Sequence, residues 1–316
     1  MTPFRLRKWY LDGLNADGAF VLAFLAEVRF VGLAHRVLNL EVVPPGGVAA
    51  ARLSIPLRRL EATPDGGASF DGGGLRLGPA GGLTVERDDL RVDLKLTHPA
   101  PARDEELPVL EVAHGRRRLL WMPRVPTAEL CGTVALPGQL FEVASCQGYA
   151  DFVESTILPP ITPVDLLLWG RAHDPEAAAT FALLVRARRP LRGLVVVEHR
   201  GRLEAFGTPA LSVHELAPAP VGGGMCPRRY EISATRPDAR VQVSVEHGRP
   251  LSVADFVADS MPSHPRAAAA LSLLARRPRG AKHLAVAVVR LETAAGTILT
   301  GAIPCIAEAV RFGRRA

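Results

Sequence analysis

The sequence predicts an all-β protein made of antiparallel sheets, and two observations support this prediction. Apolar and polar residues alternate with a period of two in several segments, most clearly at residues 90–96 and 241–245. This period places successive side chains on opposite faces of a half-buried strand. Many short strands with frequent turns are typical of sandwiches and barrels. Turn motifs separate the predicted strands at residues 44–47, 65–67, 71–74, 79–82 and 137–138.

The first two strands are predicted near the N-terminus. Trp9 and Tyr10 open one strand, residues 15–18 form a turn with Asn, Asp and Gly, and the apolar run 19–25 returns as the next strand. Continuous apolar runs also predict strands that are covered on both faces or that face a lumen. These runs lie at residues 21–24, 182–185, 194–197 and 284–289.

Two segments carry helix signals. Asp174 is a suitable N-cap and Pro175 suits the first helical position, so residues 174–179 form either a short helix or a turn. Residues 263–277 are rich in Ala and Leu, become basic at their C-terminal end and are followed by Pro278. A basic last turn and a following proline are typical of a helix end, so we predict one short helix there.

The Pro-rich segment 158–163 is the predicted domain boundary. About seven strand-like runs precede it and about seven follow it. A chain of 316 residues is long enough for two domains that each bury a core. We therefore predict an N-terminal domain of residues 1–163 and a C-terminal domain of residues 164–316. No internal sequence repeat is evident.

The charge pattern argues against a nucleic-acid partner. The chain is 48% hydrophobic and 22% charged, as expected for a globular protein, and its net charge is +6. Its arginines are spread along the chain without interleaved aromatic residues, which favours a solvated surface. Residues 1–5 are not followed by the apolar core of a signal peptide, and run 284–289 is too short to span a bilayer. We expect a cytoplasmic protein without stable membrane insertion.

Metal, nucleotide and hydrolase motifs are missing from the sequence. Gly72, Gly73 and Gly74 lack the Lys and Ser/Thr of a phosphate-binding loop, and no Gly-x-Ser-x-Gly or His-x-x-x-His spacing occurs. The predictions are therefore that no metal is bound and that no cofactor is needed. The scattered cysteines are expected to be buried free thiols of a reducing compartment. They are Cys131, Cys146, Cys226 and Cys305.

Two segments resemble the carotenoid 1,2-hydratase (hydroxyneurosporene synthase) family. Residues 9–18 resemble the opening Trp-Tyr-x-Asp-Gly/Ala-Leu-x-x-Asp-Gly of that family. Gly148, Tyr149 and Asp151 match its Gly-Tyr-His-Asp-His-Asn-Trp-Gly motif, and a Pro-containing link and a Trp-Gly-Arg-Ala strand follow at residues 158–172. The chain departs from the family where it has Ala150, Phe152, Val153 and Glu154 in place of His, His, Asn and Trp.

The resemblance implies two tandem lipocalin-like β-barrels that process an apolar small molecule, with a helix beside the last strands. Proteins that look like this group either add water to a terminal carotenoid alkene or cyclise polyketide chains, including by [4+2] cycloaddition. Loss of the motif's His and Asn residues counts against hydration. Cyclisation needs mainly a shaped apolar cavity and one or two hydrogen-bond donors.

We therefore predict a cofactor-independent cyclase, similar to a Diels–Alderase. It would hold an apolar polyene or polyketide-type molecule in a cavity between or within the barrels. Two alternatives stay open: a hydratase that adds water to an alkene, and a carrier of a lipid or pigment without catalysis. The oligomeric state stays undetermined.

Asp151, Tyr149 and Glu154 are the predicted catalytic residues. A carboxyl group desolvated in an apolar cavity has a raised pKa, so it can protonate an alkene or polarise a conjugated carbonyl. Tyr149 can donate a hydrogen bond from an aromatic wall. The structural alternatives are that Asp151 caps a turn or pairs with Arg171, that Tyr149 packs in a core, and that Glu154 lies at the surface.

The predicted substrate-binding residues are aromatic or polar groups beside apolar strands. Aromatic faces suit a polyene and stabilise developing cations, although each ring could equally pack in a core. Glu27 lies in an apolar stretch and needs a partner such as Arg29 or Arg171. A neutral core or rim histidine is the alternative for His173. The set comprises Trp9, Tyr10, Glu27, Trp121, Trp169, Arg171 and His173.

Overall fold

The computed structural model confirms the all-β prediction, because no helix occurs among the residues it describes. Nothing in the described segments has the form of an apolar helix that could cross a membrane. Residues 177–179 of the first segment with helix signals are strand rather than helix, whereas residues 174–176 and the predicted helix 263–277 lie outside the described part. The described residues are 4–44, 51–78, 80–97, 108–157, 164–173, 177–187, 189–199, 202–208, 210–221, 224–255 and 278–312.

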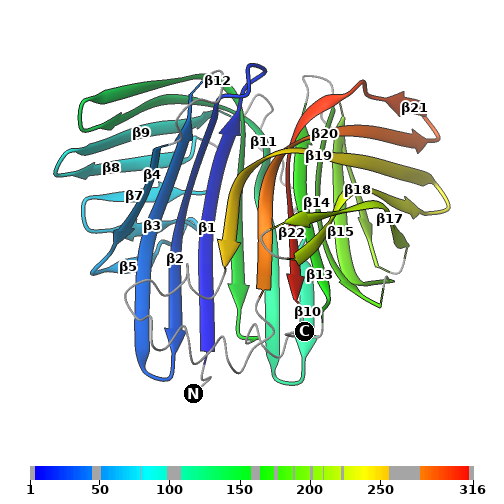
Figure 1. The fold of residues 1–316 in the computed structure, drawn as a ribbon, viewed down its shortest axis with the longest axis horizontal. Helices are drawn as coiled ribbons and strands as arrows, with labels where there is room; N and C mark the ends of the chain where they lie inside the picture. Colours follow the sequence, from blue (N-terminus) through cyan, green and yellow to red (C-terminus); the bar gives the residue numbers. More distant parts are fainter. Residues whose placement is uncertain are drawn as a thin grey trace. The chain divides into compact units, whose positions relative to one another are not determined.

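The first sheet has twelve strands and is antiparallel at every pairing that defines the site (Figure 1). Its strands are β1 (Phe4–Leu14), β2 (Phe20–Phe30), β3 (Leu33–Val43), β4 (Ala51–Pro56), β5 (Leu60–Ala62), β6 (Ala68–Phe70), β7 (Gly73–Arg76), β8 (Gly82–Arg87), β9 (Leu90–Thr97), β10 (Leu110–His114), β11 (Arg117–Leu136) and β12 (Gln139–Ser155). Their spatial order is β4-β3-β2-β1-β12-β11-β9-β8-β7-β6-β5, with β10 paired to β11.

The second sheet has ten strands. They are β13 (Leu166–His173), β14 (Ala177–Arg186), β15 (Arg189–His199), β16 (Arg202–Gly207), β17 (Leu211–Val221), β18 (Gly224–Thr235), β19 (Ala239–Asp255), β20 (Pro278–Thr293), β21 (Gly296–Leu299) and β22 (Ile303–Phe312). Their order is β16-β15-β14-β13-β22-β20-β19-β18-β17, with β21 paired to β20. Because β17 also approaches β15, this sheet curls back on itself.

Both sheets share one topological feature, which is that the first strand pairs with the last. In the first sheet β1 pairs with β12, and in the second β13 pairs with β22. From that pair each sheet continues on one side through the next three strands in chain order. This repeat of lipocalin-like topology confirms the tandem fold, although no sequence repeat reveals it.

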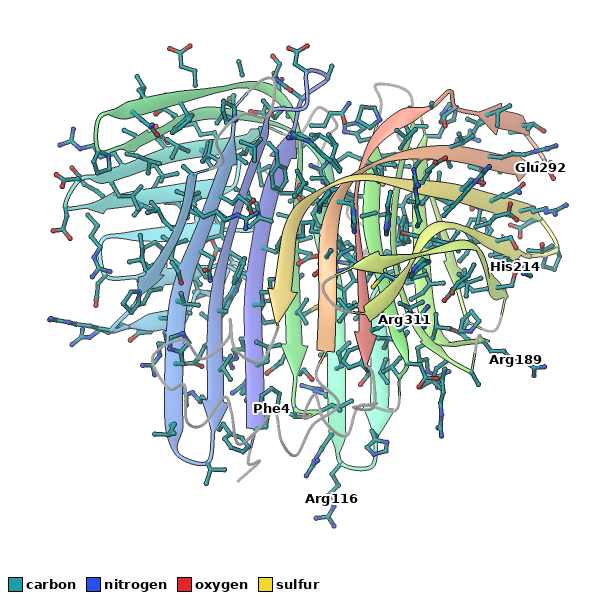
Figure 2. The ribbon with its side chains drawn as sticks, viewed as in Figure 1. Phe4, Arg116, Arg189, His214, Glu292 and Arg311 are labelled. Carbon is teal, nitrogen blue, oxygen red and sulfur yellow. The ribbon has the colours of Figure 1, made fainter. Side chains whose placement is uncertain are left out.

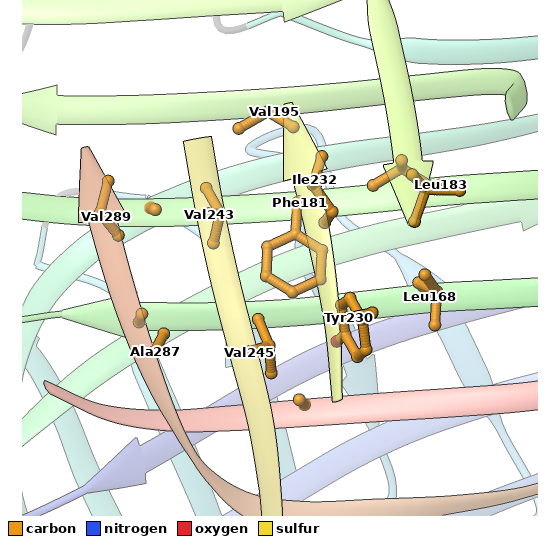
Figure 3. Close-up of a cluster of buried hydrophobic side chains, with 14 of the residues drawn as sticks. Leu168, Phe181, Leu183, Val195, Tyr230, Ile232, Val243, Val245, Ala287 and Val289 are labelled. Carbon is orange, nitrogen blue, oxygen red and sulfur yellow. The ribbon is translucent and has the colours of Figure 1, made fainter. Parts of the chain in front are cut away.

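The core of each sheet follows from the period of two. Leu90, Val92, Leu94 and Leu96 are buried on β9, while the residues between them are exposed. Each fully buried Val or Leu contributes about 1.5–3 kcal/mol relative to exposure. In the second sheet Phe181, Val243 and Tyr230 belong to one buried cluster, drawn in Figure 3.

Four apolar runs were predicted to be strands, and all four are. Runs 182–185 and 194–197 are buried at every position, as expected for strands covered on both faces. Run 284–289 differs, because Val286 is 47% exposed and the strand alternates between core and surface. Hydrophobic side chains on both faces therefore do not prove that both faces are covered.

The chain folds into two compact units. One comprises residues 1–109 and 113–156, and the other comprises residues 110–112 and 157–316. The predicted linker at residues 158–163 lies outside the described residues, so the boundary at 163 stays a prediction. On the described surface, Arg116 and Arg189 are exposed and extend away from the strands (Figure 2).

Candidate functional site

Four polar side chains meet on the β1–β12 pair. Tyr10 lies opposite Asp151, and Asp12 lies opposite Tyr149. Side chains alternate along a strand, so all four share one face of the sheet. The residues between them, such as Leu11 and Ala150, pack into the core of the first unit on the other face. We call these four residues and Trp121 the aspartate cluster.

Hydrogen bonds fix both carboxyl groups of the aspartate cluster. The Tyr10 hydroxyl donates to Asp12 Oδ2 over 2.6 Å, and the Tyr149 hydroxyl donates to Asp151 Oδ2 over 2.9 Å. Trp121 Nε1 on β11 donates to the same Asp151 oxygen over 2.9 Å. The rings of Tyr10 and Tyr149 meet edge to face, with centroids 6.1 Å apart. Asp151 therefore has a fixed orientation.

Burial of the two carboxyl groups would destabilise the folded protein if they had no hydrogen-bond donors. Asp12 is fully buried, and Asp151 is 4% exposed. A buried carboxylate costs several kcal/mol unless it accepts hydrogen bonds, and a bond to a charged acceptor contributes about 1.5–3 kcal/mol. The two tyrosines and Trp121 offset part of that cost. Tyr10 and Trp121, predicted from their aromatic faces, thus also donate hydrogen bonds through their polar atoms, and Tyr149 donates one to Asp151.

Two motif glycines explain how these strands lie so close to their neighbours. Gly13 and Gly148 face each other across β1 and β12. A Cβ on Gly148 would lie 2.9 Å from Leu96 Cδ2 and 3.0 Å from Leu130 Cβ, and a Cβ on Gly13 would lie 2.6 Å from Leu130 Cδ2. A side chain at either position would therefore displace the packed leucines under the aspartate cluster, which favours glycine at both.

Asp12 of the aspartate cluster, and Lys8 beside Tyr10, are not among the residues that the sequence predicted for the site. Lys8 lies on the same face of β1 as Tyr10, and its Nζ sits 5.1 Å from the Tyr10 ring centroid and 4.5 Å from that of Phe24. The signal that could have found them is the alternation itself. Positions 8, 10 and 12 share one face of the predicted first strand.

The structure places three of the predicted residues elsewhere in the first unit. Glu154 lies on the opposite face of β12 from Asp151 and pairs with Arg5 at 2.5 Å and with Arg7 at 3.7 Å. Trp9 packs in the core, 5.1 Å from the Phe152 ring. The third, Glu27, lies on β2 and pairs with Arg29 and Arg36. The aspartate cluster therefore contains neither Glu154 nor Trp9.

Glu27 has the arginine partner that its buried position requires. Its carboxylate contacts Arg29 at 3.0 Å and Arg36 at 2.9 Å, and only 3% of its side chain is exposed. Burial raises the pKa of Glu27, but hydrogen bonds and charge attraction from the two arginines outweigh burial and leave that pKa below its usual value. Glu27 is thus an ionised carboxylate held by a surface ion-pair network.

Trp169, Arg171 and His173 share one face of β13, opposite the core residues Leu166 and Leu168. Trp169 and Arg171 are buried, at 7% and 2% exposure. Lys282 Nζ lies 5.1 Å from the Trp169 ring centroid. These three residues belong to the second unit, so their action together with Asp151 stays a prediction.

Sequence reasoning missed a further buried polar group in the second unit, made of Tyr230, His247 and His283. His247 continues the alternation of Val241, Val243 and Val245, which is the signal that could have placed it on the inner face.

Neither metal ligation nor disulfide formation is visible in the described part of the chain. No three His, Cys, Asp or Glu residues there gather as an ion site would require. All four cysteines are free thiols, and Cys131 is partly exposed rather than buried as predicted. Burial raises the pKa of the Cys226 thiol, which keeps it protonated and unreactive.

Comparisons with solved structures identify the fold. An AttH-type protein from Nitrosomonas europaea matches with a TM-score of 0.57 and 13% identity, over 98% of this chain and 93% of that one. CghA matches with a TM-score of 0.63 and 10% identity, over 100% of this chain and 91% of that one. Kievitone hydratase from Nectria haematococca matches with a TM-score of 0.53 and 7% identity, over 97% and 88%.

The sequence by itself finds no such relatives. No family model matches the chain, and no curated protein matches it. The structural matches cover nearly the whole chain and confirm the tandem lipocalin-like fold that the two motifs implied. At these identities the likeness concerns the fold alone.

Proposed function

We propose that this protein is a cofactor-independent enzyme that cyclises an apolar polyene or polyketide-type molecule. Asp151 and Tyr149 would contact the polar end of the substrate, and Trp121 would keep the Asp151 carboxylate in place. The observation that carries the proposal is the buried Asp151, whose Oδ2 accepts hydrogen bonds from Tyr149 and Trp121 at 2.9 Å each.

The chemistry of a cyclisation suits such a site. The reaction makes carbon–carbon bonds within one molecule, so it adds no atoms and needs no electron acceptor. The protein must hold the chain in a reactive conformer and orient its polar end. Fixed hydrogen-bonding groups can do this without reorganising during the reaction. Asp151 and its two donors form such a fixed set.

The structural matches support an enzyme in general terms. Kievitone hydratase is named for the addition of water, and CghA was also crystallised with the compound Sch210972. Both share the fold of this chain. They favour a small molecule as the ligand, and they do not distinguish a cyclase from a hydratase.

Asp151→Asn tests the role of the carboxyl group. The substitution keeps the size of the side chain and replaces one carboxyl oxygen by an amide nitrogen, so we expect a folded protein with a rate at least about 10²-fold lower. Asp93→Asn is the matched control, because Asp93 is 56% exposed and lies outside the aspartate cluster. Equal turnover of the Asp151→Asn variant and the control would remove Asp151 from the mechanism.

Labelled water separates the possible reactions. Linear polyene and polyketide substrates are incubated with the protein in ¹⁸O-water, and the products are weighed by mass spectrometry. A cyclase gives a product with the mass of its substrate and no label. Label in the product together with a mass gain of one water would establish the hydratase instead. Tight binding without any conversion would establish the carrier.

A further inference from the structure

Tyr230, His247 and His283 form a compact group on three neighbouring strands of the second unit. They lie on β18, β19 and β20. The imidazole rings of His247 and His283 are stacked, with centroids 4.3 Å apart and planes inclined by 13°. The Tyr230 ring meets His247 edge to face, with centroids 5.4 Å apart. We call these three residues the inner polar group.

The inner polar group points into the core of its own unit. Each member is two positions from a core residue on its strand: Ile232 for Tyr230, Val245 for His247 and Ala285 for His283. Two positions along a strand return a side chain to the same face. Figure 3 shows Tyr230 within this apolar cluster. All three side chains are at least nine-tenths buried, at 0%, 4% and 5% exposure.

Three polar atoms of the group lack partners in the described part of the chain. The Tyr230 hydroxyl, His247 Nε2 and His283 Nε2 are buried and make no hydrogen bond there. A buried polar atom without a partner destabilises the folded state, so most such atoms in native proteins are paired. Three such atoms on side chains whose rings contact one another in sequence, Tyr230 to His247 and His247 to His283, therefore point to a ligand group that completes them.

The hydrogen-bonding roles follow from the contacts of His283. Its Nδ1 lies 3.4 Å from the Gly248 carbonyl oxygen, which can only accept, so Nδ1 carries the proton. In a neutral imidazole Nε2 is then an acceptor. Burial lowers the pKa of His283, and burial with the neighbouring imidazole lowers that of His247 to about 3, so both rings are neutral. Tyr230 supplies a hydroxyl that can donate.

A metal ion does not fit this geometry. Lone pairs of imidazole nitrogens lie in the ring plane, and these two planes are nearly parallel with ring centroids 4.3 Å apart. The lone pairs run side by side instead of converging on one ion at about 2.0–2.1 Å. The surroundings are apolar and small, since Ala307 and Cys305 face His283 and Ala285 across the β20–β22 pair.

We propose that the inner polar group binds the hydroxyl group of an apolar small molecule, such as a phenol, an enol or an alcohol. The ligand hydroxyl donates to His283 Nε2 and accepts from Tyr230, and the apolar residues of the second unit contact its body. This site lies in a different unit from the aspartate cluster and does not depend on the proposed cyclisation.

Titration of the 316-residue chain with 1-naphthol tests the site, with calorimetry as the readout. The control ligand is 1-methoxynaphthalene, which keeps the apolar body and cannot donate. We expect 1-naphthol to bind about tenfold or more tightly than the ether. We expect Tyr230→Phe to weaken 1-naphthol binding about five- to tenfold, as loss of one hydrogen bond predicts. His247→Leu is a second variant and should also weaken it.

Thermal unfolding of the ligand-free variants separates a binding site from a structural one. The Tyr230 hydroxyl has no partner to lose, so Tyr230→Phe should leave Tm unchanged or raise it. A lower Tm of Tyr230→Phe with unchanged 1-naphthol affinity would mean that the group holds a structural water, and would overturn the proposal. Equal binding of 1-naphthol and the ether by the wild-type protein would overturn it as well.

Discussion

Tyr149 and Tyr230 are both fully buried, yet their hydroxyl groups have opposite surroundings. Tyr149 donates to Asp151, whereas Tyr230 has no hydrogen-bond partner among the described residues. We predict that Tyr149→Phe lowers the free energy of unfolding by about 1–2 kcal/mol, because Asp151 loses one of its donors. Urea unfolding measures the difference, with Tyr230→Phe as the matched control. Equal stability of the two variants would show that the bond to Asp151 contributes nothing.

A second single residue, His247, makes the free energy of unfolding depend on pH. Burial, together with neighbouring His283, lowers its pKa from 6.5 to about 3 in the folded protein. The unfolded chain therefore binds this proton first as the pH falls. The stabilising contribution is complete above about pH 6.5 and is lost between there and about pH 3, roughly 5 kcal/mol in total.

The variant His247→Leu isolates that contribution. Its neighbours His283 and Tyr230 remain. The decrease in the free energy of unfolding at low pH that comes from carboxylates and from His283 is therefore the same in the variant and in the wild-type protein. We predict that the free energy of unfolding falls less steeply from pH 7 to pH 4 in His247→Leu than in the wild type. Parallel pH profiles from urea unfolding would contradict the buried, neutral state of His247.

At the scale of elements, the β1–β12 pair decides where the site can be. Its two facing glycines, Gly13 and Gly148, let Leu130 and Leu96 pack beneath the strands. We predict that Gly148→Ala lowers the free energy of unfolding by about 1–3 kcal/mol through overpacking. Gly301→Ala is the matched control, since a Cβ there has nothing within 4 Å. Equal denaturation midpoints for the two variants would refute the close approach.

At the scale of the whole molecule, one topology occurs twice and carries different residues each time. The first and last strands of the first sheet hold two carboxyl groups with their aromatic donors. The corresponding pair in the second sheet holds Trp169, Glu308 and the buried Arg171. A fold built from two such sheets can thus keep its frame while its polar residues diverge. The structural matches likewise span nearly the whole chain at 7–13% identity.

The sequence by itself determined the strands, because alternation and turn residues are local properties of the chain. It also singled out Tyr149, Asp151 and Tyr10 as candidate site residues, through motifs at the first and last strands of the first unit. The turn before Phe20 forms at the predicted residues. Asn15 accepts hydrogen bonds from the backbone N–H groups of Gly18 and Ala19, and Gly18 has a positive φ of 77°.

Only the tertiary structure decided which of these residues meet. Asp12 and Tyr149 are far apart in the chain, and cross-strand register brings them together. The observed strand also separates Glu154 from Asp151. Side chains alternate between the two faces of a strand, and Glu154 is three positions after Asp151, so the two lie on opposite faces. The inner polar group appears only when β18, β19 and β20 are paired. Pairing over such distances depends on the packing of whole sheets, which no local pattern contains.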